Sequence, residues 1–251
     1  MSNLAEKVAV VTGASRGIGR GVALGLGEAG MTVYVTGRTI KEGDAEVPGT
    51  IRGTAQEVTK LGGKGIPVRC DHRDDEQVEA LFGRVAAEQG RLDVLVNNVW
   101  GGYENMIEGD EYTWERPFWQ QPRWRWDAMF RAGVRAHYVA SQLAASTMIA
   151  QGSGLIVNIS FWASQKYMAN IAYGVSKAAT DRLTVDMAHE LRAHNVAAVS
   201  LYPGLVRTER VMRAAEFLDL SNSESPQFIG RPERHAKIGG GTGTRIWLYG
   251  H

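Results

Sequence analysis

The chain has 251 residues, of which 44% are hydrophobic and 22% are charged, and its formal net charge is +1. This length suits one α/β domain, the composition excludes a disordered chain, and the charge argues against a general nucleic-acid binder. The one cysteine, Cys70, excludes an internal disulfide and a multi-cysteine metal site, as is typical of a reducing compartment. Residues 1–7 lack a signal-peptide pattern, and no apolar stretch approaches the roughly 18 residues that cross a bilayer. We expect a cytoplasmic protein that binds no metal, membrane or nucleic acid.

Short β-branched runs alternate with helical patterns along most of the chain. The runs predict strands at 8–12, 32–36, 65–70, 92–97, 155–159 and 196–201. The helical patterns follow the first strand and recur at 54–61, 74–89, about 126–151 and 173–194. Strands joined by crossover helices form a doubly wound parallel sheet of the Rossmann type, with three layers. We expect a single α/β domain at residues 1–231 and an atypical glycine-rich tail at 232–251.

Residues 100–126 show no clear periodicity, yet they contain five of the seven tryptophans. These are Trp100, Trp114, Trp119, Trp124 and Trp126. A long stretch without regular structure inside a compact domain is usually functional, and a loop after a strand's carboxyl end borders the ligand crevice. We favour a substrate-pocket role for this insertion over a surface flap folded on its own aromatic side chains.

Residues 12–19 form a glycine-rich turn between the first strand and the first helix. Three glycines let the backbone turn sharply and approach a pyrophosphate, which then lies at the positive end of the helix. The residues expected to hold a dinucleotide here are Gly13, Ser15, Arg16, Gly17, Ile18 and Gly19. Such a turn alone is a weak signal, because an ordinary loop can match it; its position between strand and helix strengthens the prediction.

The charges near this turn indicate which dinucleotide binds. An NAD site typically has a carboxylate near the end of the second strand, whereas this chain has Gly37, Arg38 and Thr39 there. Arginine suits bidentate contact with phosphate, so Arg16 and Arg38 predict binding of a ribose 2′-phosphate. The alternative is that both arginines are merely solvated. We favour NADP(H) as the cofactor.

A tyrosine and a lysine stand four residues apart in a predicted helix. Tyr173 and Lys177 therefore share one face of it. A free tyrosine titrates at about pH 10, and a nearby ammonium group lowers that pKa. Tyr173 could then act as general acid in carbonyl reduction and as general base in alcohol oxidation. Such a pair is common by chance, but here it follows the glycine turn and the fifth strand.

Together these motifs resemble those of short-chain dehydrogenases/reductases, over residues 6 to about 231. The resemblance implies that Lys177 also binds the nicotinamide ribose and that Ser160 holds the substrate oxygen, with Ser164 as a fallback. It places the remaining cofactor contacts, to adenine, ribose and carboxamide, at Asp71, Asn97, Pro203, Val206 and Thr208. It also implies a homo-oligomer.

The chain departs from this family at several positions. Val99 and Trp100 replace the usual Ala-Gly after the paired asparagines, and aromatic residues follow Ser160 where small ones are common. We expect Trp100, Phe161 and Trp162 to form the walls of the substrate pocket. Gly133 stands where many members have an asparagine that relays protons to the lysine, so this link is absent or supplied otherwise.

The last twenty residues differ most from the family pattern. Relatives continue into a helix and a seventh strand that join dimers into tetramers, but residues 239–243 are almost all glycine, which disfavours both elements. We interpret the tail as frameshifted. A dimer built on the helices at about 126–151 and 173–194 is then expected.

The sequence as a whole predicts an NADP(H)-dependent carbonyl reductase. A hydride would pass between the nicotinamide and a carbonyl or secondary alcohol of a small hydrophobic substrate. A non-catalytic NADP(H)-binding sensor or scaffold is the alternative, supported by Gly133 and by the tail. A fragment that folds poorly for want of its last strand is a third possibility.

Overall fold

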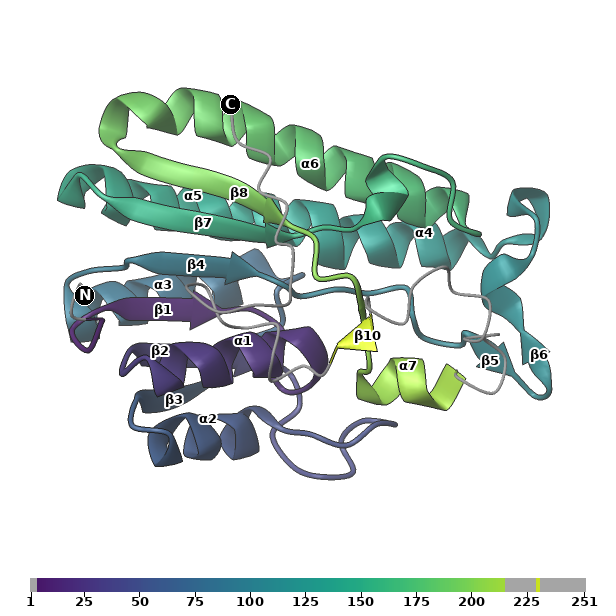
Figure 1. Ribbon diagram of the computed structural model, residues 1–251, viewed down its shortest axis with the longest axis horizontal. Coiled ribbons are helices and arrows are strands. Elements are labelled where there is room, and N and C mark those ends of the chain that lie inside the picture. Colours follow the sequence, from purple (N-terminus) through teal and green to yellow (C-terminus); the bar gives the residue numbers. More distant parts are fainter. Residues whose placement is uncertain (1–3, 215–228, 231–251) are drawn as a thin grey trace.

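The central element is a parallel sheet of six strands, which lie one above another in Figure 1. The computed structural model describes residues 4–214 and 229–230. The strands are β1 (Val8–Val11), β2 (Thr32–Gly37), β3 (Lys64–Arg69), β4 (Val94–Asn97), β7 (Gly154–Ile159) and β8 (Val196–Leu201). Their order is β3-β2-β1-β4-β7-β8. All six predicted strands and the doubly wound parallel topology are confirmed.

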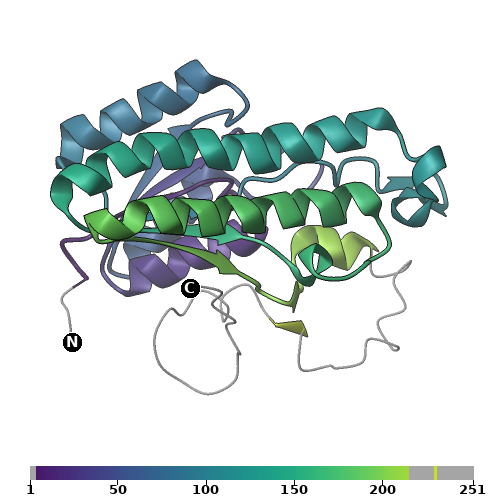
Figure 2. The same cartoon turned by 90° about the horizontal axis from the view of Figure 1, so that it is seen from above.

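Helices cover both faces of this sheet. The helices are α1 (Gly17–Glu28), α2 (Ile51–Lys60), α3 (Asp75–Gln89), α4 (Arg123–Met129), α5 (Ala136–Gln151), α6 (Ile171–Leu191) and α7 (Glu209–Ala214). Apolar side chains of α1 and α2 form one core with the sheet, and those of α3, α5 and the end of α6 form the other. Figure 2 shows α3, α5 and α6 side by side above the strands. The three layers follow the predicted pattern.

The strand order reverses at β1, and this reversal positions the site. The chain runs outward from β1 through β2 to β3, then returns to β4 on the other side of β1. β1 is thus paired on both sides, and its Ala9 lies opposite both Val33 of β2 and Val94 of β4. In open α/β sheets, ligands bind beyond the carboxyl ends of the strands at such a switch point.

The predicted helix at about 126–151 is not one regular helix. Its first part, α4, begins three residues earlier at Arg123, and residues Phe130–Arg135 form a π-helical segment before α5. A π segment carries an extra residue within the turn and is frequent at functional sites. The prediction of a single α-helix from 126 is therefore wrong in its start and in its hydrogen bonding.

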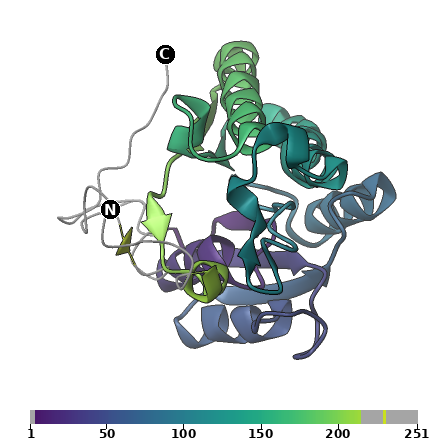
Figure 3. The ribbon, with the colours of Figure 1, turned by 90° about the vertical axis from the view of Figure 1, so that its right-hand side faces the viewer.

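The aromatic insertion has more structure than its sequence predicted. Strands β5 (Ile107–Glu108) and β6 (Glu111–Tyr112) form a short antiparallel hairpin, and two 3₁₀ turns follow, at Thr113–Glu115 and Phe118–Gln120. The buried Arg125 ties the segment together, because its guanidinium donates to the carbonyl oxygens of Asn105 and Thr113. The insertion and α7 lie beyond the carboxyl ends of the strands (Figure 1, Figure 3).

The predicted tail and domain boundary concern the C-terminal part of the chain. Short strands β9 (Leu205–Val206) and β10 (Ile229–Gly230) pair with each other, while the tail at 232–251 lies outside the described residues. The interpretation of the tail, the boundary at 231 and the dimer therefore stay predictions. Within residues 4–214 and 229–230, no helix has the length and apolarity that spanning a bilayer requires.

Candidate active site

The glycine turn after β1 suits a dinucleotide because three of its positions demand glycine. Gly13 and Gly17 have φ of +66° and +58°, in the left-handed region that favours glycine. A Cβ atom on Gly19 would lie 2.3 Å from Asn98 Nδ2 and 2.6 Å from the Gly13 carbonyl oxygen. Asn98 itself fixes the turn by donating to the carbonyl oxygens of Thr12 and Gly13. The bare backbone of this cradle can approach a pyrophosphate closely.

The amide at the start of α1 already binds an anion of the protein. The Gly17 N–H donates to Glu209 Oε2 at 3.0 Å, so the first residue of α7 places its carboxylate at the positive end of α1. The Thr208 methyl lies against the same glycine. This contact shows that the helix end accepts a negative group, which is what a pyrophosphate would supply. A bound pyrophosphate and the Glu209 carboxylate would compete for this amide.

Charged side chains gather beyond the ends of β2 and β3. The Arg16 guanidinium donates to the carbonyl oxygens of Pro48 (3.0 Å) and Gly49 (2.7 Å), which anchors the loop after β2 to the glycine turn. Burial, then the positive charges of Arg210 and Arg38, lower the pKa of Arg16, while nearby glutamates oppose them.

Arg38 and Asp71 complete this group. Arg38 is more than half exposed, with Nη1 4.0 Å from an Asp71 oxygen. A bidentate hydrogen bond from Arg73 lowers the pKa of Asp71 to about 2, so that carboxylate is ionised at neutral pH. Arg38 thus lies close to Asp71 and acts through its charge on Arg16, which is already engaged by its own chain.

The Asn97 side chain lies in the core and not at the surface where a cofactor could contact it. It is fully buried, and its amide donates to Ser141 Oγ (2.9 Å) and Asn158 Oδ1 (2.8 Å). These bonds join β4 to β7 and α5. The side chain therefore serves the core, and a cofactor contact at this position would be made by the main chain.

Tyr173 lies near the start of α6, inside a box of aromatic rings. Asn170 caps the helix by accepting from the Tyr173 N–H at 3.1 Å, which fixes the first turn. Ring centroids surround the Tyr173 ring at 5.3–6.3 Å; they belong to Trp114, Trp100, Phe161 and Tyr103. Burial, then the Tyr103 phenol, raises the pKa of Tyr173 well above its ordinary value.

Lys177 lies one turn further along α6 and is buried. Its Nζ donates to the Ile159 carbonyl oxygen at 3.0 Å and lies 3.7 Å from the centroid of the Trp100 ring. The Tyr173 ring is further away, at 5.7 Å. Burial lowers the pKa of Lys177 to about 7, although Asp181 opposes this effect.

These two pKa shifts correct one prediction. The sequence indicated that Lys177 would lower the pKa of Tyr173, but that pKa is raised. Burial outweighs the lysine, and the nearest aromatic partner of the ammonium group is the Trp100 indole. The phenol is therefore protonated at neutral pH in the structure.

Ser160 completes the group at the end of β7. Its hydroxyl is buried and has no hydrogen-bond partner among the described residues. Its neighbours in sequence contact the other two members, because Ile159 accepts from Lys177 and the Phe161 ring packs near Tyr173. The fallback, Ser164, instead hydrogen-bonds the Tyr202 hydroxyl at 2.7 Å. The structure thus favours Ser160 over Ser164.

The aromatic walls are only partly those that the sequence indicated. Trp100 and Phe161 face Tyr173, whereas Trp162 packs edge-on against Tyr202 at 5.3 Å. Sequence reasoning did not single out Tyr103 or Trp114 as neighbours of Tyr173. Trp114 could have been found as a tryptophan of the insertion, but no signal marks Tyr103.

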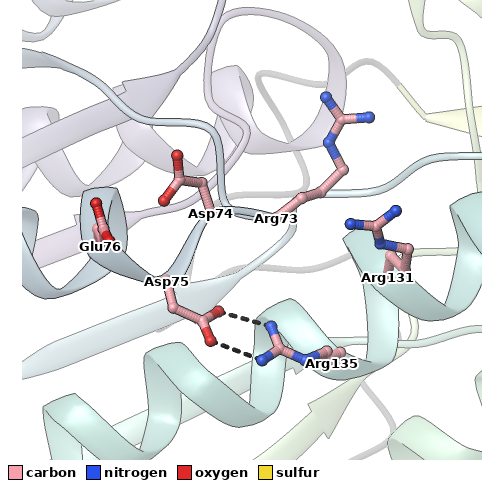
Figure 4. Close-up of a pocket in the computed structure, with 6 residues that line it drawn as sticks. All are labelled: Arg73, Asp74, Asp75, Glu76, Arg131 and Arg135. Atoms are coloured by element: carbon pink, nitrogen blue, oxygen red, sulfur yellow. Dashed lines mark hydrogen bonds and ion pairs between the residues drawn. The ribbon is translucent and has the colours of Figure 1, made fainter.

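A surface hollow lies at the start of α3, apart from this site. Its lining is entirely charged, and Arg135 donates twice to Asp75 at 2.6 Å, as Figure 4 shows. Neither Tyr173 nor Ser160 lines this hollow. None of its lining residues carries a hydroxyl group. We therefore assign the chemistry to the group of Ser160, Tyr173 and Lys177.

The parallel sheet, the glycine cradle and the buried serine, tyrosine and lysine define an oxidoreductase of the nicotinamide-dinucleotide class. The family model for short chain dehydrogenases matches residues 7–219, and the chain belongs to the short-chain dehydrogenase/reductase family.

Known proteins agree with this assignment. The chain is similar to dehydrogenase/reductase SDR family member 1, with 45% identity to the mouse protein and 49% to the human one. The matches cover 90% and 81% of this chain, and 72% and 61% of those proteins. The human relative is thus spanned over less than two thirds of its length.

Two solved structures show the same fold. A short-chain dehydrogenase/reductase from Mycobacterium marinum has a TM-score of 0.77 at 30% identity, covering 93% of this chain and 87% of that one. A metagenomic short-chain oxidoreductase in complex with NADP has a TM-score of 0.69 at 34% identity, covering 82% and 86%.

Proposed function

We propose that the protein is an NADP(H)-dependent carbonyl reductase or alcohol dehydrogenase that acts on a small hydrophobic substrate. The observation that carries this proposal is the buried, unpartnered Ser160 hydroxyl, whose chain neighbours Ile159 and Phe161 contact Lys177 and Tyr173. A buried hydroxyl without a partner costs stability, and it is retained where a ligand supplies the partner. A substrate carbonyl oxygen is such a ligand.

The chain's own residues then have distinct roles. Ser160 donates a hydrogen bond that orients and polarises the substrate oxygen. Because burial raises its pKa, Tyr173 is protonated at neutral pH and gives its proton to the oxygen as the carbonyl is reduced. Lys177 holds the nicotinamide ribose and carries the positive charge near the reacting oxygen. A bound NADPH supplies the hydride.

NADP(H) is preferred to NAD(H) on the basis of charge. Arg38 is exposed beyond β2, Arg16 lies in the glycine turn, and the position of the usual ribose-binding acid is taken by the residues 37–39. Arginine binds a 2′-phosphate through two parallel hydrogen bonds. We expect NADPH to bind at least tenfold more tightly than NADH, which is about 1.4 kcal/mol.

The substrate class follows from the walls of the site. Four aromatic rings surround Tyr173, and apolar walls bind apolar ligands. We propose a hydrophobic ketone, aldehyde or ring alcohol.

The enzyme would work as a cytoplasmic homodimer that pairs α5 and α6, both of which carry exposed apolar side chains, namely Tyr138, Ile149, Val175 and Val185.

Fluorescence titration with NADPH and NADH, followed by turnover on a panel of hydrophobic carbonyls, tests the proposal. The expected result is tight NADPH binding together with reduction of at least some members of the panel. Tight binding without turnover would favour the non-catalytic sensor or scaffold. Equal affinities for the two cofactors would overturn the NADP(H) assignment.

A further inference from the structure

Trp100 contacts both the π segment, at Gly133, and α6, at Lys177. The six-membered ring of the indole lies over Gly133. A Cβ atom on Gly133 would be 2.6 Å from Trp100 Cζ3 and 2.8 Å from Trp100 Cε3. Such distances are not tolerated, so an alanine at this position would have to displace the indole. Gly133 therefore provides the space that Trp100 fills.

The indole face also contacts Lys177. The ammonium nitrogen lies 3.7 Å from the ring centroid, and its hydrogen bond to the Ile159 carbonyl oxygen holds it there. A cation over the face of tryptophan is attracted by the ring quadrupole, most strongly when both are removed from water. Lys177 is 4% exposed, so this condition is met.

We propose that Trp100 is a positioning residue, seated by Gly133, that holds the Lys177 ammonium group against β7 and favours its charged form. The catalytic consequence rests on the proposed function, in which Lys177 must be charged to hold the ribose and support proton transfer. The structural claim does not depend on it.

Few other groups titrate near Lys177. Tyr173 and Asp181 face it from α6, and His137 faces it from the start of α5. Burial, and then the charge of Lys177, lowers the pKa of His137 to about 3, while the pKa of Tyr173 is raised. Both groups are thus neutral around pH 7, where the pKa of Lys177 lies. A change in the Lys177 ε-carbon signal near pH 7 therefore reports the titration of the lysine itself.

Replacing the indole should therefore lower the pKa of Lys177. Trp100→Leu keeps the site apolar but removes the ring face, so the charged form loses a stabilising contact. The expected decrease is about 0.5–1.5 pH units. Trp100→Phe keeps a smaller ring face and should show a smaller decrease.

NMR titration with lysine labelled with ¹³C at the ε carbon measures this directly. The chain has seven lysines, and Lys177→Arg assigns the signal of interest. The parent signal should be shifted upfield by the indole ring current, and this shift should vanish in Trp100→Leu. An unchanged or raised pKa in Trp100→Leu would overturn the proposal. If that variant does not fold, Trp100→Phe decides by the same criterion.

This measurement is independent of turnover. Loss of all carbonyl reduction with an intact ring-current shift and titration would overturn the proposed function alone. In an active enzyme, the alkaline limb of the pH–rate profile should move down with the pKa in the two Trp100 variants. A limb that does not move would overturn the link between the indole and catalysis.

The contact between Gly133 and Trp100 can be tested separately, by adding a methyl group at Gly133. Gly133→Ala should lower the melting temperature in the parent, since the new methyl group meets the indole. In the Trp100→Leu background the same change should be neutral or stabilising, because alanine favours helix over glycine. The control is Gly83→Ala in α3, where a Cβ atom meets nothing within 4 Å. An equal loss in both backgrounds would overturn the pairing of Gly133 with Trp100.

Discussion

The two sides of the candidate active site differ in the physical chemistry of their residues. Beyond β2 and β3, the candidate residues are charged and partly exposed, as in Arg38 and Asp71. Beyond β4 and β7, the proposed reacting groups are buried among aromatic rings, as in Tyr173 and Lys177. Interactions between exposed charges are screened by water and salt, whereas the pKa values of buried groups are strongly shifted by their surroundings. Changes at Arg38 should therefore alter cofactor preference, and changes at Tyr173 should alter the rate of reaction.

The largest effect is expected on the aromatic side, at Tyr173. Tyr173→Phe removes the proton donor and keeps the ring packing, so turnover should fall by roughly 10²–10⁴-fold. NADPH affinity should stay nearly the same, because the ring contacts remain. Steady-state kinetics and fluorescence titration measure the two quantities. Turnover within a factor of three of the parent would mean that another group donates the proton.

The cradle itself should show the next largest effect. Gly19→Ala forces a methyl group against Asn98 and the Gly13 carbonyl, and such overpacking costs about 1–3 kcal/mol. The distorted turn should weaken NADPH binding by at least about tenfold. Calorimetry and thermal melting check both effects, with Gly83→Ala as the matched control. A variant that binds NADPH like the parent would contradict the assignment of this turn.

Cofactor choice should respond more modestly. Arg38→Asp replaces the exposed guanidinium with a carboxylate that repels a 2′-phosphate and suits a 2′-hydroxyl. The preference for NADPH over NADH should fall by about tenfold, with NADH affinity unchanged or improved. Added salt should narrow the preference in the parent, because the contact is exposed. A preference that survives the substitution would move the phosphate contact away from Arg38.

The smallest expected effect is at the contact between α7 and α1. Glu209→Ala removes the carboxylate that the Gly17 amide binds, so NADPH should bind about threefold more tightly. Glu79→Ala, which removes an exposed acid from α3, controls for net charge. Weaker NADPH binding in the Glu209 variant would show that this carboxylate supports the cofactor site instead of competing for it.

The sequence predicted those features that depend on neighbours along the chain. β-branched runs such as Val8–Val11 are strands because their side chains are buried on both faces. The cradle at 12–19 was recognisable because positive φ angles demand glycine at defined places. The spacing of Tyr173 and Lys177 was readable because one helical turn separates them.

Other features depend on contacts between distant segments, which a single sequence does not reveal. Trp100 and Gly133 were noted as two separate departures from the family, but their fit to each other appears only when the π segment meets the end of β4. The pKa of Tyr173 was predicted in the wrong direction, since burial by the insertion could not be weighed against one lysine. Tyr103 carried no signal at all.

We propose that cofactor selection and proton transfer reside on opposite sides of the candidate active site. It is tested most directly by combining Tyr173→Phe with Arg38→Asp. Single-turnover rates at saturating cofactor, and the ratio of NADPH to NADH dissociation constants, are measured in the parent, both variants and the double variant. The account predicts that Tyr173→Phe changes only the rate, that Arg38→Asp changes only the ratio, and that the double variant shows both changes added in free energy. A change of cofactor preference in Tyr173→Phe, or a comparable loss of rate in Arg38→Asp, would contradict it.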